Sequence, residues 1–153
     1  MKHPHSEGQH MTTIIGATIV LYGRLLLVRK KGRNTWIFPG GKRRDGEDEI
    51  QCLNRELLEE LSPNVRILTA SLYKEFPTRL PYSGEDVVIK IYFVGIDGKP
   101  FPSHEIAAIT LLDYLANCEL TEPTKHIIRT LQHDGHLACI KTRCGTQGIR
   151  KRR

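Results

Sequence analysis

The sequence predicts a layered α/β fold (α+β in composition) in which helices flank a mixed β-sheet. Two observations support this prediction. Runs rich in β-forming residues are interspersed with two segments of helical periodicity, and clusters of Gly, Pro and Asp separate many of them. The chain has 153 residues, which fits a single domain with its own hydrophobic core.

The first expected element is a β-hairpin. Its two strands are the β-rich runs Thr12–Leu21 and Arg24–Arg29, and Tyr22-Gly23 forms the tight turn between them. A Pro-Gly-Gly break at residues 39–41 then ends the stretch that contains Trp36.

The first expected helix lies in the segment that Asp45-Gly46 opens. Apolar residues recur there at helical spacing, at Ile50, Leu53, Leu57 and Leu61. The helix should end near Leu61, because Pro63 disfavours the α conformation at Ser62 and has no amide donor.

Three strands and a second helix complete the expected order. The strands span residues 65–76, 87–96 and 105–112, and the turn-forming loop 77–86 separates the first two. The second helix begins after Thr121 as its N-cap and ends before Gly135, with a buried face made of Ile127, Ile128 and Leu131.

The ends of the chain differ from its centre in composition. Residues 1–10 and the basic segment 137–153 are expected to be disordered, so the folded domain should span residues 11–136. Neither a membrane-spanning run nor a secretory signal is visible, and we expect a cytoplasmic protein. Contact with nucleic acid is expected only through the basic tail. The oligomeric state is left open, a homodimer included.

The first expected helix carries an unusual concentration of negative charge. Residues 45–61 hold seven acids against one arginine, a net charge of −6, whereas the whole chain has a charge of +6. In a helix Glu56, Glu59 and Glu60 project within an arc of ~100°. A solvated helix face is one interpretation, but like charges four residues apart repel each other. Mg²⁺ would remove that repulsion, because it binds carboxylate oxygens.

The same segment resembles a known sequence signature. Gly41, five residues, Glu47, seven residues and then Arg55-Glu56-Leu57-Leu58-Glu59-Glu60 match the Nudix box of the Nudix hydrolases, which include MutT-like proteins. Ser62 and Pro63 replace the last glycine and the aliphatic residue of that pattern. The resemblance extends over roughly residues 12–131 and does not include the basic tail.

This resemblance implies an αβα sandwich with a central mixed sheet, and a metal-dependent pyrophosphohydrolase that uses Mg²⁺ or Mn²⁺. The substrate would be a nucleoside diphosphate linked to another moiety: a nucleoside triphosphate, a nucleotide sugar or a dinucleoside polyphosphate. The resemblance implies four metal ligands, which are the carboxylates of Glu56, Glu59 and Glu60 and the carbonyl of Gly40.

The resemblance also implies roles for the neighbouring charged residues. Arg55 would orient the carboxylates, and Glu47 would pair with Arg55. Glu105 matches a glutamate that in some members helps to bind metal or to deprotonate water, so either Glu59 or Glu105 would be the catalytic base.

Positive charge precedes the acidic helix. The bases at 29–33 and 42–44 would draw an anionic substrate towards the carboxylates, with Arg29 and Lys42 as the expected substrate-binding residues. The identity of the small-molecule nucleotide would depend on loops such as 77–86, which one sequence does not interpret.

Two rival functions are compatible with this fold. One is a catalytically silent Nudix-like module that binds nucleotide or RNA, and the complete set of glutamates argues against it. The other is a metal-dependent isomerase of isoprenoid diphosphates, and the absence of a suitably placed cysteine argues against that.

Overall fold

The computed structural model of the chain describes residues 11–112 and 118–137. The predictions of a disordered N-terminal segment and of a nucleic-acid-binding tail concern residues 1–10 and 138–153, which lie outside the described residues. Leu137, which the sequence analysis assigned to the tail, is buried in the core beside the second helix.

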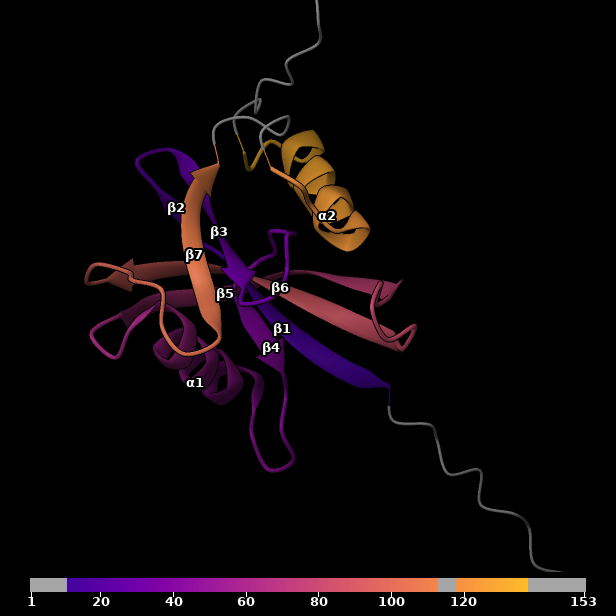
Figure 1. Ribbon diagram of the computed structural model, residues 1–153, viewed down its shortest axis with the longest axis horizontal. Coiled ribbons are helices and arrows are strands. Elements are labelled where there is room, and N and C mark those ends of the chain that lie inside the picture. The colour runs from indigo at the N-terminus through magenta and orange to yellow at the C-terminus, as the bar shows by residue number, and fades with distance from the viewer. Residues whose placement is uncertain (1–10, 113–117, 138–153) are drawn as a thin grey trace, which may run out of the picture.

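Two sheets lie between two helices (Figure 1). The first sheet has the strand order β4-β1-β6-β5, with β1 parallel to β6 and the other pairs antiparallel. The second sheet is antiparallel and has the order β2-β3-β7. The elements are β1 (Thr12–Thr18), β2 (Val20–Leu21), β3 (Arg24–Lys30), β4 (Gly40–Lys42), α1 (Glu49–Leu61), β5 (Arg66–Arg79), β6 (Asp86–Asp97), β7 (Ile106–Leu112) and α2 (Glu122–His133).

Each helix covers its own hydrophobic cluster, which confirms the predicted αβα layers. Helix α1 contributes Leu53, Leu57 and Leu61 to one cluster, and α2 contributes Ile127, Ile128 and Leu131 to the other. Strand β3 serves both clusters, because successive side chains of a strand point to opposite faces. Leu26 and Val28 belong to the α1 cluster, and Leu25 and Leu27 belong to the α2 cluster.

The predicted N-terminal hairpin is present only near its turn. Val20 and Leu21 pair with Leu25 and Arg24, and Tyr22 and Gly23 have positive φ angles, as the turn requires. Strand β1 instead leaves this sheet and pairs with β4 and, in parallel, with β6. The partner β6 is more than 70 residues away in the sequence, so local patterning did not reveal this pairing.

Helix α1 begins later than Asp45 and ends at Leu61, as the position of Pro63 in the sequence predicted. Asp48 is its N-cap, and a capping box with Gln51 satisfies backbone donors at both positions. Leu53, Leu57 and Leu61 are buried as expected, but Ile50 is 39% exposed.

Strand β4 was not predicted, because a Pro-Gly-Gly sequence normally indicates a turn. Gly40 and Gly41 pair with Gly16 and Ile15 of β1. A Cβ atom at Gly40 would collide with the Ile15 carbonyl oxygen, so the first of these glycines permits a close approach between two backbones.

The remaining elements follow the prediction with small shifts. Strand β5 extends to Arg79, three residues beyond the expected end, and pairs with β6 along its length. Helix α2 has Thr121 as its N-cap, and the hydroxyl of Thr121 accepts a hydrogen bond from the Thr124 amide. Among the described residues, no helix has the length and apolar character needed to cross a membrane.

The residue after α1 adopts a conformation that favours glycine. Ser62 has a φ of 116° and is buried, with 6% of its surface exposed. Its hydroxyl accepts a hydrogen bond from the Asn64 amide at 3.2 Å. A non-glycine residue in such a region costs about 1–3 kcal/mol.

We therefore expect Ser62→Gly to raise the free energy of unfolding by about 1 kcal/mol, because relief of strain exceeds the loss of one hydrogen bond and the added chain entropy. Urea denaturation measures this change. Ser62→Ala is the control, since it removes the hydroxyl and keeps the strain, and it should lower stability. Equal destabilisation by both substitutions would contradict the strain argument.

Candidate active site

The glutamates of α1 face the glycine strand β4. The amide of Gly40 donates to both carboxylate oxygens of Glu60, at 3.3 and 3.4 Å. A Cβ atom at Gly41 would collide with the carboxylate of Glu56. The two glycines thus form a cradle for two of the three predicted metal ligands.

Arg55 lies among the acidic side chains and bonds to several of them. Its guanidinium pairs with Glu47 through Nε, and its Nη1 lies 2.7 Å from Glu56 and 3.8 Å from Glu59. Its Nη2 donates to the Lys42 carbonyl at 3.1 Å, which ties the helix to β4. The structure therefore brings together Glu47, Arg55, Glu56 and Glu59, the geometry expected of an arginine that orients carboxylates.

The charges in this cluster perturb one another. Hydrogen bonding to Arg55, and to the Arg44 amide, lowers the pKa of Glu47 to about 2. The same pairing with Glu47, followed by the pairing with Glu56, raises the pKa of Arg55. Glu47 and Arg55 thus remain an ion pair across the physiological pH range.

Glu60 is the least exposed of the three glutamates. It is 6% exposed, and burial, together with the neighbouring charge of Glu56, raises its pKa to about 8. The positive charge of Lys30 acts in the opposite direction but does not cancel this effect. Two neighbouring carboxylates, one of them buried, are an arrangement that a bound cation would stabilise.

The donor set fits Mg²⁺ or Mn²⁺, since it consists of carboxylate oxygens. Within residues 11–112 and 118–137, however, no three His, Cys, Asp or Glu side chains are already grouped as a metal site. Arg55 contacts one oxygen of each of two of these carboxylates, Oε1 of Glu56 and Oε2 of Glu59.

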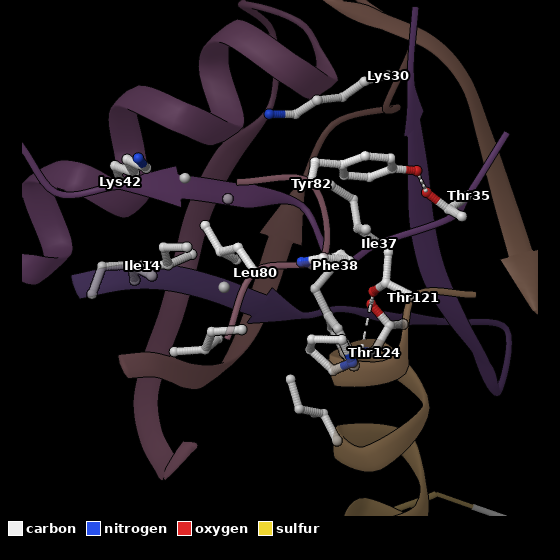
Figure 2. A pocket seen from close by; sticks show the side chains of 18 of the residues that line it. Ile14, Lys30, Thr35, Ile37, Phe38, Lys42, Leu80, Tyr82, Thr121 and Thr124 are labelled. Carbon is white, nitrogen blue, oxygen red and sulfur yellow. Dashed lines mark hydrogen bonds between the residues drawn. The ribbon is translucent and has the colours of Figure 1, made fainter. Parts of the chain in front are cut away.

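A cavity of about 360 Å³ opens beside β4 (Figure 2). Its walls are mostly apolar. Gly40, Gly41 and Lys42 line the end near α1, and Thr121 and Thr124 line the end at the start of α2. The apolar walls include Ile14, Phe38, Ile89, Ile91 and Ile127. Pockets of this size and composition bind small organic molecules.

The positive residues around the cavity differ in part from those expected. Lys30, Arg33 and Lys42 line it, and Figure 2 shows Lys30 extending towards helix α1. Arg29 does not line it; its guanidinium lies over the Trp36 ring and donates to the Arg33 carbonyl. Both residues lie at the end of β3, where the pairing of this strand with β7 shifts its register. Lys42 is paired with Glu85 at 2.9 Å.

Glu105 precedes β7 in a loop that contacts the end of α1. The Ser103 amide of this loop donates to the Glu60 carbonyl at 3.1 Å, and the Glu105 carbonyl accepts from the Lys31 amide. The Glu105 side chain itself is exposed. Its catalytic role stays a prediction, as do the roles of the other site residues.

Sequence reasoning did not single out Arg33, Tyr82 or the three threonines of the cavity, Thr35, Thr121 and Thr124, as site residues. The bases at 29–33 were noted as a group, and their charge does not indicate which of them line a cavity. The loop that contains Tyr82 carries no pattern that places it over a cavity, because its position depends on the pairing of β5 with β6.

Comparison with known proteins agrees with this geometry. The NUDIX domain family model matches residues 13–131. No curated protein sequence gave a match. Among solved structures, a MutT NUDIX hydrolase from Burkholderia pseudomallei is 25% identical, with a TM-score of 0.66 over 79% of this chain and 98% of that one.

Two further structures share the fold. A UDP-X diphosphatase is 24% identical, with a TM-score of 0.67 over 87% of this chain and 68% of that one. The E. coli ORF135 protein is 23% identical, with a TM-score of 0.62 over 81% of this chain and 92% of that one. The family model covers most of the chain, and the box residues meet in one place. The chain therefore belongs to the NUDIX domain family and is an enzyme of the Nudix hydrolase type.

Proposed function

We propose that the protein is a metal-dependent pyrophosphohydrolase that cleaves a nucleoside diphosphate linked to another moiety. One observation carries the proposal: the glutamates of α1 meet the glycine strand β4 at one end of a largely apolar cavity. A charged reaction centre that adjoins an apolar pocket suits a substrate with a diphosphate at one end and a nucleoside at the other.

Glu56, Glu59, Glu60 and the carbonyl of Gly40 are the proposed ligands of Mg²⁺ or Mn²⁺. A bound ion would supply the positive charge that phosphoryl transfer requires and would acidify the attacking water. Arg55 would hold Glu56 and Glu59 in place from the opposite side, and Glu47 would keep Arg55 oriented.

The proton of the attacking water is assigned to a carboxylate. Water attacks phosphorus, the bond from phosphorus to the bridging oxygen breaks, and two phosphate-bearing products leave. Glu59 is a suitable acceptor because its side chain is 44% exposed, whereas Glu60 is buried. Glu105 is the second candidate, from the loop that contacts the end of α1.

The nucleoside is assigned to the cavity. Lys30 and Lys42 lie at its edge near the glutamates and would attract the phosphates. The apolar walls would then receive the base and sugar. Nothing in the described residues favours the silent binding module, since Arg55 and the glutamates are all present and the arginine contacts two of them.

The cradle predicts the effect of a single methyl group at Gly41. Its backbone lies outside the positive-φ region, so alanine is tolerated there, but its Cβ would displace the Glu56 carboxylate. We expect Gly41→Ala to weaken Mn²⁺ binding by about 10- to 100-fold while the fold is retained. Electron paramagnetic resonance titration measures free Mn²⁺.

Leu58→Ala is the control for this experiment, because Leu58 is an exposed residue of the same helix. It should bind Mn²⁺ like the wild type. Wild-type affinity in Gly41→Ala would show that Glu56 is not a ligand held in this cradle.

Product analysis tests the reaction itself. We expect the protein, with Mg²⁺ or Mn²⁺, to cleave at least one class in a panel of nucleoside triphosphates, nucleotide sugars and dinucleoside polyphosphates. Glu59→Gln should reduce kcat by at least about 100-fold, because it removes a ligand or the base. Glu105→Gln, assayed beside it, distinguishes the two candidate bases. Undiminished turnover in Glu59→Gln would contradict the proposed metal site.

A further inference from the structure

The loop between β5 and β6 covers one side of the cavity. Four of its residues line the cavity: Leu80, Pro81, Tyr82 and Ser83. Two backbone hydrogen bonds of 2.9 Å close the loop, from the Leu80 amide to the Glu85 carbonyl and from the Gly84 amide to the Leu80 carbonyl. We call residues 80–85 the cavity loop.

The base of the cavity loop is fixed to the sheet by Glu85. One carboxylate oxygen of Glu85 accepts from the Thr12 hydroxyl at 2.6 Å, and the other pairs with Lys42 at 2.9 Å. Thr12 begins β1 and Lys42 ends β4, so the loop is anchored to both strands beside the glutamates. This anchoring restrains the loop that carries Tyr82.

Tyr82 is held by contacts with Thr35 and Arg33 although it is 56% exposed. Its hydroxyl lies 3.1 Å from the Thr35 hydroxyl, and Figure 2 shows this contact. The guanidinium of Arg33 lies 3.6 Å from the centre of its ring. An exposed aromatic side chain that is restrained at its hydroxyl, at one ring face and at its loop loses little further freedom when it contacts a ligand.

We propose that Tyr82 is a specificity-determining residue, which stacks on the base of the nucleotide substrate and covers it in the cavity. The inference rests on the proposed function, since it assigns the base of that nucleotide. Bases stack on aromatic rings whatever their hydrogen-bonding edge, so this contact selects for a base and not for one particular base. Arg33 and Thr35 are positioning residues that hold the ring.

Isothermal titration calorimetry tests this role without hydrolysis. The ligands are AMP, GMP, CMP and UMP. Ribose 5-phosphate is the control ligand, because it has the sugar and the phosphate but no base. We expect Tyr82→Ala to weaken binding of the four nucleotides by about tenfold, or about 1.4 kcal/mol. Binding of ribose 5-phosphate should stay within about twofold of the wild-type value.

Further variants separate stacking from folding. Tyr82→Phe and Tyr82→Trp keep a ring and should bind the nucleotides within about threefold of the wild type. Tyr22→Asn removes a 93% exposed tyrosine from the β2–β3 turn and should change nothing, since asparagine accepts the positive φ of that position.

Three results would overturn the proposal: equal losses for the nucleotides and ribose 5-phosphate, no loss for either, or a wild-type protein that does not prefer the nucleotides to ribose 5-phosphate. The proposed hydrolysis fails separately, through the absence of cleaved products in the panel assay. A protein that binds bases through Tyr82 but cleaves nothing would therefore support the role of Tyr82 and contradict the proposed hydrolysis.

Discussion

The arrangement of the site depends on the ion pair between Arg55 and Glu47. One guanidinium neutralises part of an acidic segment, contacts Glu56 and Glu59, and donates to the Lys42 carbonyl. It therefore fixes the helix, its carboxylates and β4 relative to one another. The arginine offsets part of the concentrated negative charge, and in the proposed site a cation would offset more of it.

The sheet provides the surface against which this cluster is assembled. Strand β1 lies between β4 and β6, so the backbone at Gly40 and Gly41 is held by pairing with a central strand. Because Gly41 lacks a side chain, the Glu56 carboxylate of α1 lies close against β4. Gly40 permits a close approach of β4 to β1, and its amide donates to Glu60. Strand β4 therefore contributes both to the carboxylate cluster and to the lining of the cavity.

Local features were predictable and long-range placements were not. The end of α1 and the N-cap Thr121 follow from interactions within a few residues of each other, and the box residues follow from the resemblance to the Nudix signature. The pairing of β1 with β6 and the position of Tyr82 over the cavity depend on contacts between distant segments. Arg29 and Lys30 are neighbours in β3, but Lys30 lines the cavity and Arg29 does not, and a charge count does not separate them.

The most direct test of the central claim is a crystal structure of the protein grown with Mn²⁺, with an anomalous difference map that locates the ion. The account predicts a peak at coordination distance from Glu56, Glu59 and Glu60, with Arg55 still paired to Glu47. A map in which Mn²⁺ is bound elsewhere, or in which these three carboxylates remain without a metal ion at saturating Mn²⁺, would contradict it.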